Sequence, residues 1–146
     1  MICNLRPGGA LDLPAVYLGE LRYIQYWEPG HEQAWHLDVE RHLTRWVMHM
    51  ERLTIAEADR QVVGYVLWLP EGEQAELCTL SVSEPYRRKG IGQALLAHYL
   101  NSSQQQGYVH HTLSVRADNP ARRLYEQAGF VQTGVDANGY LRYGRV

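Results

Sequence analysis

The sequence has few of the features that mark secreted or membrane-bound proteins. Cys3 and Cys78 are the only cysteines among 146 residues, too few for a disulfide framework, and we expect both to be free thiols. No apolar run approaches the roughly 20 residues that a membrane-spanning helix needs. Residues 1–12 also lack the charged start and long apolar stretch of a signal peptide. These absences predict a soluble, cytoplasmic protein that has no membrane partner.

An excess of positive charge is also missing. The chain carries 14 basic and 16 acidic residues, a formal net charge of −2, whereas a nucleic-acid-binding protein usually shows a basic excess over a broad face. The positive charge is instead local, at Arg87–Lys89 and again at Arg122 and Arg123. Hydrophobic residues make up 45% of the chain and charged residues 21%, which is ordinary for a globular protein. We therefore expect one folded domain over residues 1–146, no nucleic-acid partner and a compact anionic ligand.

Turn residues and apolar periodicity predict an α/β domain with a mixed central sheet of about seven strands and four helices. The helices are expected after Asp12, over 31–50, from near Gly90 to about Gln106 and over 119–129. Strands are expected at residues 2–9, 52–58, 61–69, 75–83, 108–116, 130–134 and 140–146. The sequence "VVGYVLWL" is almost continuously apolar, as expected for a central strand covered on both faces.

Local signals set the expected ends and faces of these helices. Asp12 is expected to cap the first helix, with Pro14 in its first turn. Asn119 is expected to cap the last helix, and Gly129 to end it. The 31–50 helix carries an apolar stripe at the spacing of an amphipathic helix. Its members are Trp35, Val39, Leu43, Trp46, Val47 and Met50.

The segment "SEPYRRKGIG", residues 83–92, places three basic residues directly before Gly90 and Gly92, at the start of a helix. The first turn of a helix leaves backbone N–H groups without partners, and the helix dipole adds partial positive charge there. Glycines allow a phosphate to approach those groups, and arginines add charge-assisted hydrogen bonds. The segment therefore predicts a pyrophosphate site, with a solvated surface turn as the alternative. It matches neither the Walker loop nor the dinucleotide-binding glycine pattern.

Residues 75–133 resemble the GNAT superfamily of acetyl-CoA-dependent N-acetyltransferases. The signature Arg/Gln-x-x-Gly-x-Gly/Ala stands here as Arg87 to Gly92. A second signature stands as Asn119, the pair Leu124-Tyr125 and the pair Gly129-Phe130. The order of the preceding elements also matches the family. The resemblance implies a GNAT-type sheet that is splayed between its fourth and fifth strands.

The resemblance also implies individual site residues for acetyl-CoA. Backbone groups of Leu80, Ser81 and Val82 should meet the pantetheine arm, with the Val82 N–H facing the thioester carbonyl. Asn119 should hydrogen-bond the pantetheine, and Tyr125 stands where the family often has a general acid. The pyrophosphate should be held by the segment that comprises Arg87, Arg88, Lys89, Gly90, Ile91, Gly92 and Gln93.

The general base stays open at this point. Glu76 matches the position of the catalytic glutamate in the histone-acetyltransferase branch of the family. The ribosomal-protein branch has its glutamate where this sequence has Ser114, which cannot act as a base unaided, so that branch is disfavoured. His110 and His111 could substitute through water, although a histidine pair on a strand is more often structural. A proton could also leave through water alone.

The acceptor site is expected at the loop between the first two helices, with Tyr26, Trp27, Glu28 and His31 as candidates. Seven histidines do not form a recognisable ligand set, so no metal is expected. The predicted function is acetyl transfer from acetyl-CoA to a primary amine of a small molecule or peptide. The alternatives are a non-catalytic acyl-CoA-binding sensor or interaction module, and a site for another phosphate-bearing nucleotide. A homodimer that pairs through the strand at 140–146 is also possible.

Overall fold

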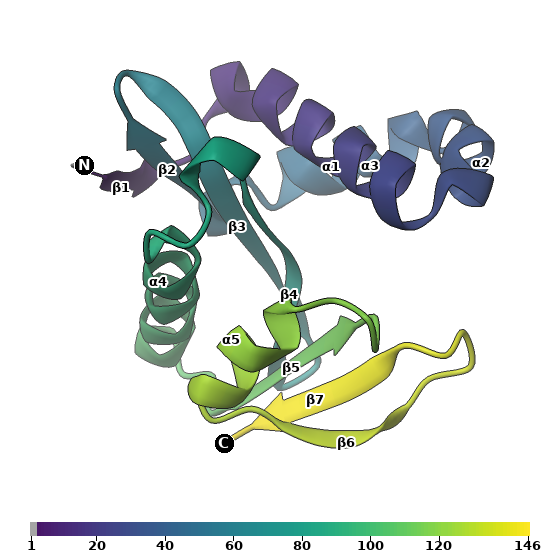
Figure 1. Ribbon diagram of the computed structural model, residues 1–146. Coiled ribbons are helices and arrows are strands. Elements are labelled where there is room, and N and C mark those ends of the chain that lie inside the picture. The colour runs from purple at the N-terminus through teal and green to yellow at the C-terminus, as the bar shows by residue number, and fades with distance from the viewer. Residues whose placement is uncertain (1–2) are drawn as a thin grey trace.

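The computed structural model describes residues 3–146 and contains one seven-stranded mixed sheet, which confirms the predicted α/β fold class (Figure 1). The strand order is β1-β2-β3-β4-β5-β7-β6, and only the β4–β5 pair is parallel. The predicted first strand began at Ile2, which lies outside the described residues. The elements are β1 (Asn4–Pro7), α1 (Leu13–Trp27), α2 (Glu32–Leu37), α3 (Val39–Met48), β2 (Leu53–Ala58), β3 (Gln61–Glu71), β4 (Gln74–Val82), α4 (Ile91–Gln105), β5 (His110–Val115), α5 (Ala121–Gln127), β6 (Val131–Val135) and β7 (Leu141–Arg145).

Helices cover both faces of the sheet. One hydrophobic cluster joins Val16 of α1 and Trp46 of α3 to one face, and another joins α4 and α5 to the opposite face. Figure 1 shows α1–α3 together on one side and α4 and α5 on the other. The strand β3 contributes Tyr65 to the first cluster and Val66 to the second, because successive side chains alternate between faces. This two-sided burial explains the apolar run in β3.

The parallel pair β4–β5 is short, and this creates the main irregularity of the sheet. The strands pair only through Gln74–Glu76 and His110–Thr112, although β4 continues to Val82. Next to the point of separation, the register of β3 against β4 shifts so that Cys78 has no opposite residue. Residues 77–82 and 113–115 therefore leave a gap in the ladder, which we call the fork. The splay predicted between the fourth and fifth strands is present.

The predicted helix over 31–50 is in fact two helices. α2 ends at Leu37, and α3 begins at Val39, with Asp38 between them in a non-helical conformation. Trp35 of α2 and Trp46 of α3 both pack in the cluster under α1. Other members of the predicted stripe lie in solvent, since Leu43 and Val47 are exposed. Residues 3–146 thus contain five α-helices where the sequence predicted four.

Two further local predictions were wrong. Asp12 precedes α1 but does not cap it, because its carboxylate accepts hydrogen bonds from Arg6 at 2.8 and 2.9 Å and from the Gly9 amide at 2.9 Å.

The last strand is not an edge of the sheet, because β7 pairs with β5 on one side and with β6 on the other. Any partner strand would therefore have to meet β1 or β6, and pairing through residues 140–146 is excluded.

A buried histidine makes the stability of the fold depend on pH. His111 is 0% exposed, and its Nε2 lies 2.8 Å from the Ser103 hydroxyl, which itself donates to the carbonyl of Tyr99. Nε2–H is therefore the donor to Ser103, while Nδ1 is buried with no partner among the described residues. Burial, followed by the charge of Arg145, lowers the pKa of His111. The neutral form of His111 is the form that the folded protein holds.

We expect the free energy of unfolding to fall as pH drops below about 6.5, because the unfolded chain then binds a proton that the folded chain rejects. Denaturant unfolding near neutral pH and near pH 5.5 measures this loss. His111→Gln should reduce the pH dependence, whereas His110→Gln, at the exposed neighbouring position, should preserve it. Identical pH dependence in all three proteins would contradict this role of His111.

Candidate active site

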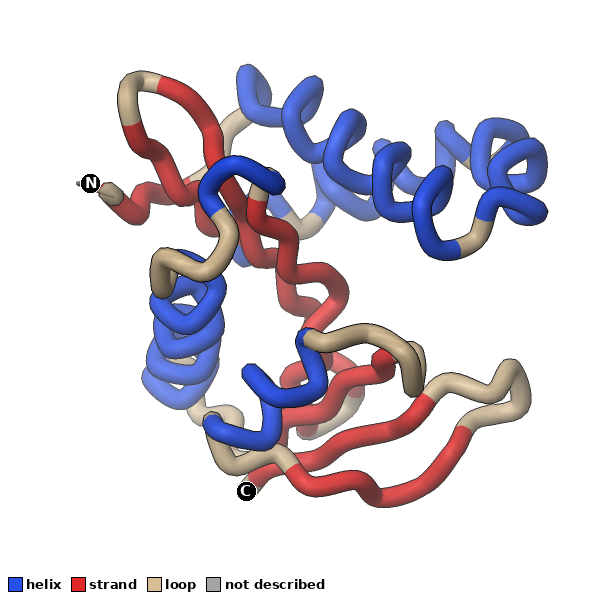
Figure 2. Tube along the Cα trace, viewed as in Figure 1, coloured by secondary structure: helices blue, strands red, loops and turns tan. Residues whose placement is uncertain are grey.

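The start of α4 presents a row of unpaired backbone donors. Gly90 adopts φ +84°, a conformation that favours glycine, and α4 begins at Ile91. The first amide that bonds within the helix is that of Ala94, which donates to the Gly90 carbonyl at 3.0 Å. Within residues 3–146, the amides from 88 to 93 have no acceptor. Figure 2 shows the preceding residues as a loop between the short helix η4 (Glu84–Tyr86) and α4.

Basic side chains surround these donors. Arg87 turns back onto the sheet, where its Nε donates to the Val82 carbonyl at 2.8 Å. Arg88 and Lys89 are exposed, and no carboxylate in the described part of the chain lies within 4.0 Å of either. Unpaired amides next to unpaired cations form an arrangement that stabilises a bound anion.

Backbone groups of β4 also point into the fork. The Ser83 amide donates to the Val63 carbonyl at 2.8 Å, so these two residues form a hydrogen-bonded pair. Because such pairs alternate along an antiparallel ladder, Ser81 is the next residue bonded to β3. The polar backbone groups of Leu80 and Val82 then point away from β3, toward the fork. The side chain of Ser81 lies on the α1 side of the sheet.

The helix α5 brings Tyr125 and Asn119 to the same region. The Asn119 Oδ1 accepts from the Ala121 amide at 2.9 Å, which confirms that Asn119 caps the first turn. Gly129 closes the helix at φ +96°, and the Phe130 amide donates to the Tyr125 carbonyl, as in a Schellman motif. Tyr125 is 7% exposed, and its burial raises the pKa of the phenol. Its hydroxyl is therefore protonated at neutral pH.

The predicted base Glu76 is engaged by other side chains. Its Oε1 accepts from Arg142 at 2.8 Å, and its Oε2 accepts from Thr112 at 3.3 Å. Arg142 also donates to the hydroxyl of Ser114 at 2.7 Å. The two histidines of β5 separate, since His110 is exposed while His111 is buried against Ser103. Burial excludes His111 from contact with an acceptor molecule.

Among the predicted acceptor residues, Glu28 contacts Tyr140 and Arg116, which the sequence did not indicate as site residues. Glu28 accepts from the Tyr140 hydroxyl at 2.5 Å and lies 3.8 Å from Arg116, whose guanidinium is 5.7 Å from the centre of the Trp27 ring. We call Glu28, Arg116 and Tyr140 the clasp. It joins the end of α1 to the β5–α5 and β6–β7 loops. Tyr26, which is 76% exposed, and His31, 3.3 Å from Glu28, lie beside it.

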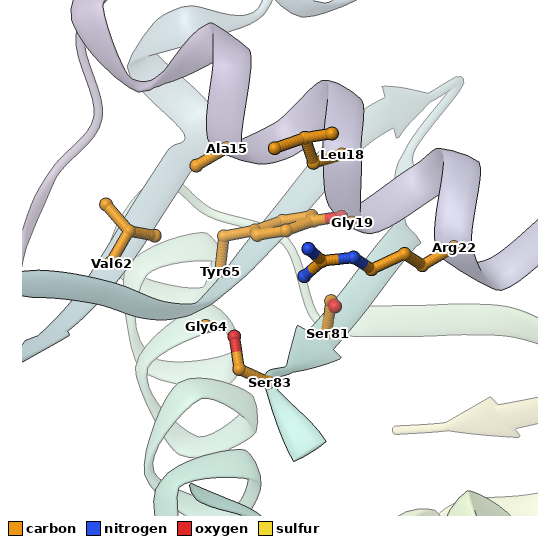
Figure 3. Close-up of a pocket in the computed structure, with 9 residues that line it drawn as sticks. All are labelled: Ala15, Leu18, Gly19, Arg22, Val62, Gly64, Tyr65, Ser81 and Ser83. Carbon is orange, nitrogen blue, oxygen red and sulfur yellow. The ribbon is translucent and has the colours of Figure 1, made fainter. Parts of the chain in front are cut away.

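A small cavity of about 150 Å³ lies between α1 and the ends of β3 and β4 (Figure 3). Its shape depends on Gly19, where an added Cβ would overlap the Tyr65 hydroxyl. Figure 3 shows the Arg22 guanidinium reaching from α1 between Tyr65 and Ser81. The lining residues are Ala15, Leu18, Gly19, Arg22, Val62, Gly64, Tyr65, Ser81 and Ser83.

Membrane-spanning helices and clusters of metal-ligating side chains are both absent from residues 3–146. None of the described helices is both long enough and apolar enough to cross a membrane. In the same part of the chain, no three His, Cys, Asp or Glu side chains gather in a way that could hold a metal ion. Cys3 and Cys78 are both free thiols, and Cys78 is exposed.

Solved structures share this architecture. The PaiA N-acetyltransferase of Thermoplasma acidophilum, solved in complex with coenzyme A, superimposes with a TM-score of 0.84 at 18% identity and covers 99% of both chains. A ribosomal-protein-alanine N-acetyltransferase of Brucella melitensis gives a TM-score of 0.82 at 22% identity, over 98% of this chain and 99% of that one. Likeness at these identities shows the fold.

Sequence relatives point to the same family. The mycothiol acetyltransferase of Clavibacter sepedonicus is 32% identical over 122 residues, which are 83% of this chain and 40% of that protein. The [ribosomal protein bS18]-alanine N-acetyltransferase of Escherichia coli K12 is 36% identical over 69 residues, 47% of each chain. The chain thus spans about half the length of the curated relatives it matches. Residues 20–130 match the Acetyltransferase (GNAT) family, and the chain belongs to that family.

Proposed function

We propose that this chain is an acetyl-CoA-dependent N-acetyltransferase that acts on a primary amine of a small molecule or peptide. The observation that carries the proposal is the row of unpaired amides at 88–93, flanked by the unpaired cations Arg88 and Lys89. The names of the relatives support acetyl transfer, and the complex of PaiA with coenzyme A supports the choice of cofactor.

The chain's own residues fit coenzyme A along one path. The amides at 88–93 would hold the pyrophosphate, and the backbone groups of Leu80 and the amide of Val82 would meet the pantetheine arm in the fork. Asn119, whose Oδ1 accepts from the Ala121 amide and whose side chain also interacts with the Tyr23 hydroxyl, would hydrogen-bond the same arm. Acetyl-CoA, when bound, supplies an acyl group activated as a thioester.

Amide formation needs a base for the ammonium group, a donor to the carbonyl oxygen and a donor to the departing sulfur. The residues around the fork would provide the two donors. The Val82 N–H, which points away from β3, would stabilise negative charge on the carbonyl oxygen. Tyr125 would donate a hydrogen bond to the departing sulfur. Because its raised pKa lies far above that of a thiol, we propose a hydrogen bond that strengthens in the transition state rather than full proton transfer.

One observation favours a second candidate, a non-catalytic module that binds acyl-CoA. Glu76, the predicted base, has both carboxylate oxygens engaged by Arg142 and Thr112, and accepting a proton would disrupt the ion pair. Coenzyme binding alone does not separate the two candidates, because both use the same site at the start of α4. Only turnover of an amine distinguishes them.

The test is an assay of acetyl-CoA with a panel of primary amines, including amino acids, polyamines and peptides with free N-termini, in which release of the coenzyme thiol is followed. We expect thiol release above the rate of spontaneous hydrolysis with at least one amine, and thermal stabilisation by coenzyme A. Stabilisation without release would favour the binding module. Stabilisation only by another phosphate-bearing nucleotide would overturn the assignment of the site.

A further inference from the structure

A carboxylate on α1 reaches the fork from the side opposite α4. Glu20 Oε2 accepts a hydrogen bond from the Tyr65 hydroxyl of β3 at 2.6 Å and from the Thr79 hydroxyl of β4 at 3.0 Å. Thr79 lies within 77–82, the part of β4 that β5 leaves unpaired. Glu20 is thus bonded to the stretch of strand that would carry the acyl arm, although it comes from a helix far away in the sequence.

Glu20 is the carboxylate of this region that remains able to accept a proton. Both hydrogen bonds engage Oε2, and Oε1 has no hydrogen-bond partner among residues 3–146. No cation in that range lies within 4.0 Å of Glu20, whereas Glu76 is paired with Arg142 and Glu28 belongs to the clasp. Two donors on one oxygen fix the orientation of the carboxylate and leave the other oxygen available.

The surroundings of Glu20 shift its titration in the direction that a base needs. Burial raises the pKa of Glu20, while the hydrogen bonds from Tyr65 and Thr79 and the charge of Arg45 on α3 lower it by less. Cys78 of β4 and Tyr23, which is on α1 like Glu20, also interact electrostatically with this carboxylate. A carboxylate with a raised pKa takes a proton from an ammonium group more readily than an ordinary one.

Tyr23, one turn further along α1, is near enough to Glu20 and to Tyr125 for electrostatic interaction with both. Burial raises the pKa of Tyr23, and the charges of Glu28 and Glu20 add to that rise. The same tyrosine adds to the raised pKa of Tyr125 on α5, after the contribution of burial. The groups proposed to handle protons therefore lie within electrostatic reach of each other across the fork.

We infer that Glu20 is the general base of the proposed acetyl transfer, in place of Glu76. The inference rests on the proposed function. Glu20 takes one proton from the ammonium group of the acceptor, and the nitrogen lone pair then forms the C–N bond to the acetyl carbon while the C–S bond breaks. The second proton of the nitrogen goes to the departing sulfur, which receives the electron pair of the C–S bond. Glu20 releases its proton to water after the products leave.

Glu20→Gln tests the inference, because it keeps the size and the hydrogen-bond acceptor but removes the base. With the best amine of the panel, we expect kcat/KM to fall by about 100-fold or more, within the range of general-base catalysis. The acidic limb of the pH–kcat/KM profile should also disappear, while coenzyme A affinity stays unchanged. Glu40→Gln, at an exposed site on α3, is the matched control and should behave as the wild type.

Tyr65→Phe provides a second test that does not remove the carboxylate. Loss of the Tyr65 hydroxyl removes a hydrogen bond that lowers the pKa of Glu20, so the acidic limb should move to higher pH. Gly19→Ala, whose added methyl group would overlap that hydroxyl, should move the limb in the same direction. A Glu residue that is merely structural would change stability without moving the limb.

Direct titration completes the experiment. Carbon-13 NMR of the protein with coenzyme A, with the Glu20 carboxyl assigned by comparison with Glu20→Gln, should give a pKa above the ordinary value of about 4.3. The inference is overturned if Glu20 titrates normally, or if Glu20→Gln keeps kcat/KM within about threefold while Glu76→Gln abolishes it. A wild-type protein that binds coenzyme A but acetylates no amine would overturn the proposed function itself, and the role of Glu20 with it.

Discussion

Replacing Tyr125 by phenylalanine is expected to lower kcat by about 100-fold while leaving the affinity for coenzyme A nearly unchanged. The phenol is buried on α5, and burial raises its pKa, so at neutral pH it is a hydrogen-bond donor and never a phenolate. No acceptor among residues 3–146 takes that hydrogen bond, which leaves it available for the departing sulfur. A donor that acts only as charge develops on sulfur contributes to kcat and little to binding.

Steady-state kinetics with acetyl-CoA and the best amine, together with calorimetric titration of coenzyme A, measure both quantities. Tyr108→Phe is the matched control. It removes a hydroxyl from a tyrosine that packs against Trp68 and follows the C-terminal end of α4, away from the helix start. Equal kcat values for the wild type and Tyr125→Phe would remove Tyr125 from the mechanism, and a parallel loss of coenzyme affinity would make it a binding residue instead.

The parts of the site that the sequence predicted are those built by local signals. Gly90 supplies a backbone conformation that favours glycine and starts α4, while Asn119 and Gly129 set the two ends of α5. Each of these signals acts within a few residues, so its effect does not depend on the rest of the fold. The fork itself was implied only by the family resemblance, because the end of pairing between β4 and β5 leaves no local pattern in the sequence.

The parts that the sequence analysis missed depend on contacts between distant elements. Arg116 and Tyr140 meet Glu28 only because three loops converge, and no spacing within the chain indicates that contact. For Glu20, in contrast, the sequence did contain an indication that the side chain faces the sheet. It lies four residues after Val16, which is fully buried, so both share the sheet-facing side of α1. A carboxylate on a buried helix face needs a partner or a function, and the structure supplies Tyr65 and Thr79.

The break between α2 and α3 at Asp38 is a feature that apolar periodicity could not predict. Residues on both sides of the break keep helical spacing, so the apolar pattern alone predicts one continuous helix. Trp35 and Trp46 lie about three helical turns apart, so a continuous helix would also place both against one cluster, and their packing does not by itself account for the break. The structure breaks the helix at Asp38 and leaves Leu43 and Val47 exposed, and the apolar spacing contains no signal for either result.

Replacing Arg88 by alanine is expected to raise the KM for acetyl-CoA by about 10- to 150-fold with little change in kcat. Arg88 makes no ion pair among residues 3–146 and lies beside the free amides at the start of α4, so its guanidinium is available to a phosphate. A hydrogen bond to a charged group contributes roughly 1.5–3 kcal/mol, which corresponds to that range. The effect should shrink at high salt, because ions screen an exposed charge.

Arg87→Ala is expected to affect kcat as well as KM, unlike Arg88→Ala, so the two variants distinguish support of β4 from binding of the phosphate. Arg87 donates to the Val82 carbonyl, so its loss frees the end of β4 and should lower kcat as well as raise KM. Arg41→Ala, at an exposed arginine of α3, is the control for the loss of one positive charge and should leave both constants unchanged. If the Arg87→Ala/Arg88→Ala double variant binds coenzyme A as tightly as the wild type, the amides at 88–93 do not hold its pyrophosphate. The proposed path of the coenzyme through the fork would then be wrong, because that path begins at those amides.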